Sequence, residues 1–290
     1  MLSGSLKGKP VRTDTPETEF LRHVAACQTA RLPGDRSAFR IGQAQVGWVG
    51  AALAARLENF AVIRRDADGL TLLAADELPR LTRITADEGF HRWRNEAFDV
   101  RAVPDGPVLG RIDRGAVPAF GVFAVGVHVN GLVERADGLH VWIARRAANK
   151  LLDPGKLDHI VAGGVPAGLT PDETLIKEAA EEAAIPAELA RQARQVGTIG
   201  YAMDRPEGLR RDHLHCYDLM LPESFEPRAV DGEVAGFELW PLPQVVEAVR
   251  STTDFKFNVN LVLIDLFIRR GVVTGEPAAA LRRALAAGQT

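Results

Sequence analysis

The order of apolar and polar positions predicts two units along the chain. In the first unit, helical periodicity and short apolar runs favour two helices and two short strands: 17–30 and 46–57 for the helices, 60–63 and 70–73 for the strands. Proline, glycine and charged residues then crowd residues 101–118, a composition typical of a break between ordered segments. We therefore predict a small N-terminal α/β domain over 1–117 and a second domain over 118–290.

The second domain shows strand patterns interleaved with helix patterns. Apolar residues run almost without interruption over 121–129, and three further strands are expected: 139–144, 195–201 and 214–221. Helical periodicity marks four segments: 172–184, 242–250, 260–270 and 277–287. Asn130-Gly131 and Asp137-Gly138 have turn sequences. Strands flanked by helices predict an α/β sandwich with a mixed sheet.

Composition narrows the class of protein. The chain has 290 residues, enough for two domains, and a formal net charge of −3 without a basic stripe, which argues against a nucleic-acid polymer as ligand. Only Cys27 and Cys216 occur, and they lie far apart, which fits a reducing compartment. Residues 1–15 lack the apolar core of a signal segment, and no apolar run reaches the roughly 18 residues of a membrane span. We expect a cytoplasmic protein that does not enter a membrane.

A glycine-rich loop at residues 163–168 leads into a helix with a well-defined start. Thr170, Pro171 and Glu173 have the order of an N-cap, a first-turn proline and the acid of a capping box. Glu173 also lies four residues before Lys177, a spacing that favours an ion pair on the helix surface. We interpret both features as structural.

The same helix carries a cluster of acidic residues. Glu178, Glu181 and Glu182 stand at i, i+3 and i+4, so their carboxylates share one face of the helix. Three like charges repel each other, and a bound Mg²⁺ would convert this repulsion into a binding site, because Mg²⁺ takes carboxylate oxygens as ligands. The alternative is a solvated acidic face without a ligand.

The whole segment resembles the Nudix box, Gly-x5-Glu-x7-Arg-Glu-U-x-Glu-Glu-x-Gly-U, in which U is apolar. Aligned from Gly163, the box places Glu178 after its arginine and Glu181 and Glu182 at its glutamate pair. Three positions depart from the family pattern: Leu169 replaces the first glutamate, Lys177 the arginine and Ala184 the glycine. The departures change the loop and the helix end, and they leave the three glutamates in place.

The resemblance implies a Mg²⁺-dependent hydrolase of phosphoanhydride bonds, built as a Nudix α/β/α sandwich. It implies Glu178, Glu181 and Glu182 as metal ligands, with Mn²⁺ as the alternative ion. Glu181 and Glu182 would act in catalysis with Glu233, which is a candidate general base or, alternatively, a turn residue. The residues expected to bind substrate are Arg145, Arg146, Lys150, Gly163 and Gly164. The alternative for Arg145, Arg146 and Lys150 is that they are solvated surface residues that do not bind substrate.

Shorter segments resemble one branch of the family, the thiamine pyrophosphokinase-related Nudix proteins, which carry an N-terminal domain of unknown function. These segments are 142–146, 156–158, 217–219, 221–222, 231–234 with Phe237, and 255–258. The branch is associated with diphosphates of thiamine and its oxidised analogues, which implies a pocket with aromatic faces from among Trp142, Tyr201, Phe237 and Trp240.

Two alternatives to a hydrolase of thiamine-type diphosphates stay open. One is a hydrolase of a nucleoside diphosphate derivative or nucleotide sugar, and the other is a sensor that binds a diphosphate without cleaving it. In each case the expected partner is a small-molecule diphosphate. The sequence leaves open whether the chain forms a homodimer.

Overall fold

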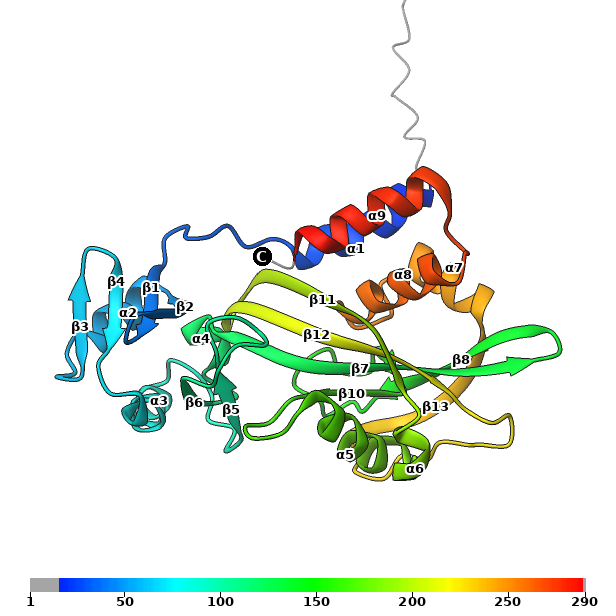
Figure 1. Ribbon diagram of the computed structural model, residues 1–290, viewed down its shortest axis with the longest axis horizontal. Coiled ribbons are helices and arrows are strands. Elements are labelled where there is room, and N and C mark those ends of the chain that lie inside the picture. Colours follow the sequence, from blue (N-terminus) through cyan, green and yellow to red (C-terminus); the bar gives the residue numbers. More distant parts are fainter. Residues whose placement is uncertain (1–15, 289–290) are drawn as a thin grey trace, which may run out of the picture.

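The computed structural model describes residues 16–288. Residues 1–15, for which the sequence predicts no signal segment, lie outside the described residues, as do 289–290. A small N-terminal unit, blue to cyan in Figure 1, lies at one end of a larger unit that is built around a long, twisted sheet.

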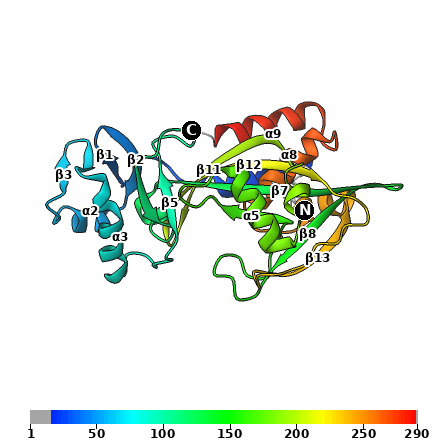
Figure 2. The same cartoon turned by 60° about the horizontal axis from the view of Figure 1, so that its bottom comes forward.

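The N-terminal unit contains a four-stranded sheet with the order β2-β1-β4-β3. Its elements are β1 (Ser37–Ile41), β2 (Ala44–Val49), α2 (Ala51–Leu57), β3 (Ile63–Asp66), β4 (Gly69–Leu72), a 3₁₀ turn (Ala75–Glu77) and α3 (Leu78–Asp87). A hairpin of β5 (Ala97–Val100) and β6 (Gly110–Asp113) and the short helix α4 (Val117–Phe120) follow. Phe39, Leu57, Leu70 and Leu81 are fully buried in a core of this unit's own. Figure 2 shows β5 between the small sheet and the large one.

Two predictions for this unit are wrong in part. Residues 46–49 of the expected helix lie in β2, because Val46 and Val49 bury their branched side chains in the core and the strand pairs with β1. The helix begins only after Gly50. The strand expected at 60–63 begins at Ile63, and the residues before it form the turn that follows α2.

Within residues 16–288 the larger unit contains a seven-stranded sheet with the main order β11-β12-β7-β8-β13. The strands are β7 (Phe123–Arg135), β8 (Gly138–Arg146), β9 (Leu157–His159), β10 (Val161–Gly164), β11 (Arg194–Arg205), β12 (Gly208–Met220) and β13 (Val234–Pro241). β12 runs parallel to β7, whereas the other pairs are antiparallel. The predicted mixed sheet is therefore confirmed.

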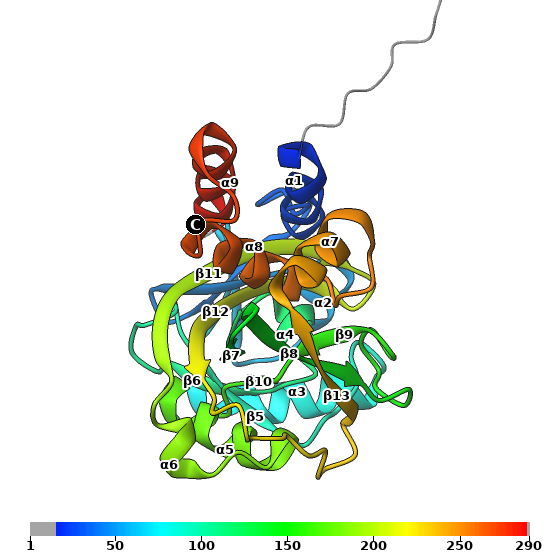
Figure 3. The same cartoon turned by 90° about the vertical axis from the view of Figure 1, so that its right-hand side faces the viewer.

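Helices cover both faces of this sheet (Figure 3). On one face lie α1 (Pro16–Cys27), α7 (Leu242–Ser251), α8 (Val259–Arg269) and α9 (Gly275–Ala287); on the other lie α5 (Pro171–Ala183) and α6 (Ala187–Ala190). This arrangement confirms the α/β/α sandwich. No helix within residues 16–288 is long and apolar enough to cross a membrane.

The turn predicted at Asn130-Gly131 is wrong, because both residues lie inside β7. Gly131 pairs with Trp142, and a Cβ at Gly131 would lie 2.8 Å from Cγ2 of Ile160. The glycine therefore leaves room for the side chain of Ile160, which connects β9 and β10, and the chain reverses at the second predicted turn, before Gly138.

The first helix packs on the larger unit although it precedes the smaller one in sequence. α1 lies beside α9 in Figures 1 and 3, the Phe20 and Phe267 rings are 5.9 Å apart, and His23 Nε2 lies 2.7 Å from the carbonyl oxygen of Val249. The boundary at 117/118 stays a prediction.

Candidate active site

The start of α5 matches the sequence pattern. The Thr170 hydroxyl accepts a hydrogen bond from the Glu173 amide at 3.2 Å, and the Glu173 carboxylate accepts one from the Thr170 amide at 2.9 Å. This confirms the capping box and fixes the direction of the helix. The predicted pair between Glu173 and Lys177 is wrong: Glu173 is held in the cap, and Lys177 Nζ contacts Glu178 at 3.1 Å and Glu181 at 2.5 Å.

Glu178 and Glu182 project from α5 into a cavity of about 790 Å³ that lies between the two units. The Glu178 side chain lies against Gly163, where an added Cβ would come within 2.7 Å of Glu178 Cγ and Cδ. Burial raises the pKa of Glu178 although the neighbouring Lys177 opposes the shift. Glu178 therefore occupies space that only a glycine at position 163 leaves open.

Glu182 is the most buried of the three box glutamates. Its side chain accepts a hydrogen bond from the amide of Ala162 at 2.9 Å, and the whole residue is 8% exposed. Burial raises the pKa of Glu182 well above its ordinary value, and the nearby charges of Asp158 and Glu178 act in the same direction. Burial disfavours the ionised form of this carboxylate, and a cation bound beside it would stabilise that form.

Glu181 points elsewhere. Its side chain is 51% exposed, pairs with Lys177, and does not line the cavity. Glu233, from the loop before β13, does line the cavity and pairs with Lys150. Burial raises the pKa of Glu233, but the hydrogen bond and charge of Lys150, together with the charges of Arg114 and Arg146, outweigh burial, so the pKa lies below its ordinary value. The structure thus brings Glu178, Glu182 and Glu233 to one cavity.

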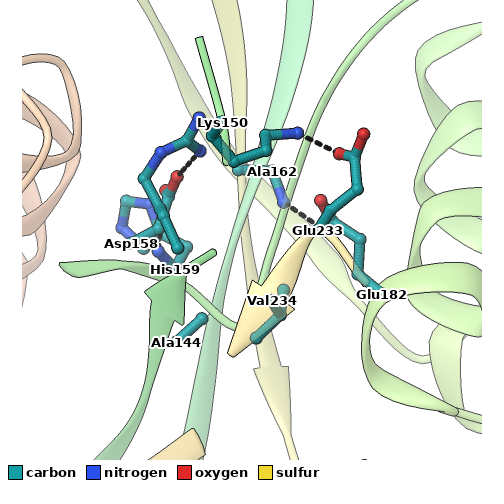
Figure 4. Close-up of a pocket in the computed structure, with 9 residues that line it drawn as sticks. Ala144, Lys150, Asp158, His159, Ala162, Glu182, Glu233 and Val234 are labelled. Atoms are coloured by element: carbon teal, nitrogen blue, oxygen red, sulfur yellow. Dashed lines mark hydrogen bonds and ion pairs between the residues drawn. The ribbon is translucent and has the colours of Figure 1, made fainter. Parts of the chain in front are cut away.

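Figure 4 shows a small void at the centre of this group, between the carboxylates of Glu182 and Glu233 on one side and Asp158 on the other. Its volume is about 10 Å³, close to that of one water-sized sphere. Arg146 and Lys150 also line this void and pair with Asp158 and Glu233, whereas Glu182 has no ion-pair partner among residues 16–288. The carboxylate of Glu182 is therefore the oxygen donor here that fits a hard divalent cation. This donor suits the metal that the resemblance implies.

The expected phosphate-binding residues lie in different places. Gly163, Gly164 and Lys150 line the cavity. Arg146 also reaches it, but its guanidinium is held by Asp158 at 2.7 Å and by the carbonyl of Leu152. Arg145 faces away from the cavity toward Glu238, at 3.7 Å. The predicted substrate role of these residues stays a prediction.

A buried polar cluster beneath the cavity was missed by the sequence analysis. His128, Asp158 and His159 are buried close enough to share a cation, and Lys256 Nζ lies 3.7 Å from Asp158. Burial would raise the pKa of Asp158, but the positive charges of Lys256, His128 and Arg146 lower it to about 2. His128 comes from β7, Asp158 and His159 are neighbours in β9, and Lys256 lies before α8, so no single local pattern reveals the cluster. A second such group, Asp105 with His213 and His215, lies outside the cavity.

The N-terminal unit also contributes side chains that no motif indicated. Arg92, Arg94 and Arg114 line the cavity from this unit, together with Phe90 and Phe98. The aromatic residues expected in the pocket, Trp142, Tyr201, Phe237 and Trp240, do not line it; they pack in or against the cores of the larger unit. The aromatic faces of the cavity therefore come from the smaller unit.

Comparison with known families assigns both units. The NUDIX domain model matches residues 124–259, and a model described as a domain of unknown function, DUF4743, matches residues 19–124. The two matched regions meet at residue 124, the second residue of β7.

Relatives with curated sequences carry the same family name. Nudix hydrolase 20, chloroplastic, and Nudix hydrolase 24, chloroplastic, both of Arabidopsis thaliana, are 42% and 44% identical over 67% and 63% of this chain. The chain spans about half the length of these two relatives, 52% and 50%. An uncharacterized Nudix hydrolase, orf19, of Rhodococcus erythropolis is 32% identical over 43% of this chain and 69% of its own length.

Proposed function

Because the chain belongs to the Nudix hydrolases, we propose that it hydrolyses a phosphoanhydride bond of a small organic diphosphate, with a monophosphate and inorganic phosphate as products. The observation that carries this proposal is the meeting of Glu178, Glu182 and Glu233 at one cavity. Such a constellation gathers negative charge where phosphoryl chemistry needs a cation.

Glu178 and Glu182 would hold the divalent metal, and the family pattern adds Glu181, which would have to turn from Lys177 toward the cavity. We expect Mg²⁺, with Mn²⁺ as the alternative. When bound, the ion offsets the charge of the phosphate oxygens in the transition state. The amide of Ala162 holds one oxygen of Glu182, which fixes the orientation of that carboxylate.

Glu233 suits the role of general base. It lines the cavity beside Glu178 and Glu182, and its carboxylate is ionised at neutral pH. Because the pair with Lys150 lowers the pKa of Glu233 and so weakens it as a base, Lys150 would have to turn away before Glu233 accepts the proton. A water oxygen attacks a phosphorus atom of the diphosphate, the water proton passes to Glu233, and the bond from that phosphorus to the bridging oxygen breaks. The bridging oxygen leaves with the other phosphoryl group.

For the organic part of the substrate we propose thiamine diphosphate or its oxidised analogues. The cavity of about 790 Å³ is large enough for a molecule of this size. Phe90 and Phe98 line the cavity as aromatic residues, and Glu207 in the same lining offers an acceptor for a cationic ring, whereas Asp212 is already held by Tyr201 and Arg210. The cavity volume also admits a nucleotide sugar, so this second substrate class belongs in the same assay.

The departure at Ala184 does not disturb the helix that carries the carboxylates. Ala184 adopts the left-handed conformation, φ 53°, that the family's glycine adopts readily, and the amide of Ile185 still bonds to the carbonyl of Ala179 at 3.0 Å. The end of the carboxylate-bearing helix is therefore formed as a glycine would form it.

The test is release of phosphate or monophosphate from thiamine diphosphate, its oxidised analogues, ADP-ribose and nucleoside triphosphates with Mg²⁺. We expect turnover of the thiamine-type diphosphates by the wild type and its loss in Glu182→Gln. Glu188→Gln, an exposed change on α6, is the matched control and keeps the wild-type rate. If none of these compounds is turned over but they still raise the thermal stability of the protein, the protein is a diphosphate sensor and the proposed hydrolase function is wrong.

A further inference from the structure

The N-terminal unit forms part of the wall of the cavity that contains the carboxylates. Three arginines of this wall, Arg92, Arg94 and Arg114, line the same cavity as Glu178 and Glu182. The first two lie in the loop between α3 and β5, and Arg114 directly follows β6. The larger unit contributes both acidic and basic residues to this cavity, whereas the smaller unit contributes mainly basic ones, the three arginines, with Glu96 beside them.

A buried carboxylate holds the two arginine-bearing segments together. Asp113 is 4% exposed and accepts hydrogen bonds from the amides of Arg94 at 2.9 Å, Gly115 at 2.8 Å and Glu96 at 3.3 Å. The amide of Arg114 also bonds to the carbonyl of Glu96 at 2.7 Å. The backbone beneath the three guanidinium groups is therefore fixed.

The positive charge of this wall is only partly balanced. Arg114 pairs with Glu96 at 2.8 Å, whereas within residues 16–288 no hydrogen bond or ion pair holds the guanidinium group of Arg92 or Arg94. Partial burial lowers the pKa of Arg94, and the charges of Arg92 and Arg114 lower it further. Mutual repulsion of this kind is relieved when an anion binds between the guanidinium groups.

The two units are also connected at the glycine loop that leads into α5. The amide of Ala167 bonds to the carbonyl of Ala97 at 2.7 Å, and the amide of Gly168 bonds to Asp99 at 3.2 Å. A Cβ at Gly164 would lie 2.6 Å from Cζ of Phe98, so the loop and β5 are in direct contact. These contacts fix the arginine wall relative to the carboxylate helix.

We propose that Arg92, Arg94 and Arg114 form an anion subsite that binds the terminal phosphate of the substrate, so that the N-terminal unit completes the substrate site. Guanidinium groups suit this ligand because they offer paired donors to phosphate oxygens and stay charged. The assignment to the terminal phosphate rests on the proposed function. Organic diphosphates thereby bind better than the corresponding monophosphates, which lack the second phosphoryl group.

The test measures binding of inorganic pyrophosphate to the full chain by calorimetry in EDTA, so that it depends on neither metal nor turnover. The wild type binds, and Arg92→Ala/Arg94→Ala weakens the affinity about tenfold or more, since each lost hydrogen bond to a charged group matters on this scale. Arg64→Ala, an exposed arginine of β3 outside the cavity, is the matched control and keeps the wild-type affinity. Arg94→Lys retains part of the affinity.

Equal affinity in the wild type and the double variant, or no pyrophosphate binding by the wild type, overturns the subsite. Kinetics separate this result from a failure of the proposed function. If diphosphates are turned over and the double variant raises KM with little change in kcat, both proposals stand. Turnover with an unchanged KM leaves the hydrolase and removes the subsite. Arginine-dependent pyrophosphate binding without turnover of any diphosphate leaves the subsite and removes the hydrolase.

Discussion

Glu178 packs its side chain directly on the backbone of Gly163, 15 residues before it in the chain, with no room for a Cβ between them. We predict that Gly163→Ala leaves the fold intact and displaces Glu178, because the end of a flexible side chain yields more readily than the strand. A shift of about 1 Å in a catalytic group can lower turnover by roughly 100-fold. Turnover and Mg²⁺ affinity of the purified variant measure the effect.

Gly197→Ala provides the control for this substitution. Gly197 lies in β11 of the same sheet, and a Cβ there would have no neighbour within 4 Å. Wild-type turnover in Gly163→Ala would contradict the role assigned to the contact, whereas loss of turnover in both variants would indicate general sensitivity of the sheet.

The features of α5 that could be predicted from the sequence are those that depend on nearby residues. The capping box and the acidic face of α5 involve residues three or four positions apart, so they are visible as local patterns, and the structure confirms the cap. The turn of Glu181 toward Lys177 is also local, but it depends on rotamers that a spacing does not define.

Long-range geometry was not predictable from one sequence. Arg92 and Arg94 reach the cavity only because Asp113, about 20 residues later, holds their loop, and neither residue belongs to a motif. The strand at 46–49 was interpreted as helix because its short apolar pattern is ambiguous until β1 pairs with it.

Ala184→Gly should stabilise the protein. Ala184 has φ 53°, a conformation that costs an L-residue about 1 kcal/mol and costs glycine little. Because glycine loses more backbone entropy on folding, the net gain in the free energy of unfolding is somewhat below that value. Urea unfolding measures it. Ala180→Gly, at an exposed position inside α5, should instead lose about 1 kcal/mol; a loss at both positions would refute the argument from φ.

Asp158→Asn should destabilise the protein at pH 7 by roughly 3–5 kcal/mol, because it leaves the buried charges of Arg146 and Lys256 without their shared partner. The folded-state pKa of Asp158, about 2, lies below its ordinary value of 3.8, so its stabilisation is present above pH 3.8 and is lost as the pH falls toward 2. The gap between wild type and variant should therefore narrow by about 1 kcal/mol between pH 5 and pH 3. Urea unfolding across this range tests the sign, and a gap that widens toward acid would contradict it.

Glu182→Gln should separate stability from activity. The folded-state pKa of Glu182 is raised, mainly by burial, so the ionised carboxylate opposes folding of the metal-free protein, and this cost grows as the pH rises above the ordinary pKa of a glutamate. In EDTA the variant should therefore be more stable than the wild type, by a larger margin at pH 8 than at pH 5. Unfolding by urea at both pH values measures the difference.

Adding Mg²⁺ should reverse the order, because a bound cation favours the ionised carboxylate that the wild type has and the variant lacks. Saturating Mg²⁺ should raise the melting temperature of the wild type more than that of Glu182→Gln, while turnover of the variant falls by roughly 100-fold or more. Glu188→Gln should show the wild-type response to EDTA, pH and Mg²⁺. A variant that responds to Mg²⁺ as the wild type does would remove Glu182 from the metal site, and the buried carboxylate would then need another cation to account for its position.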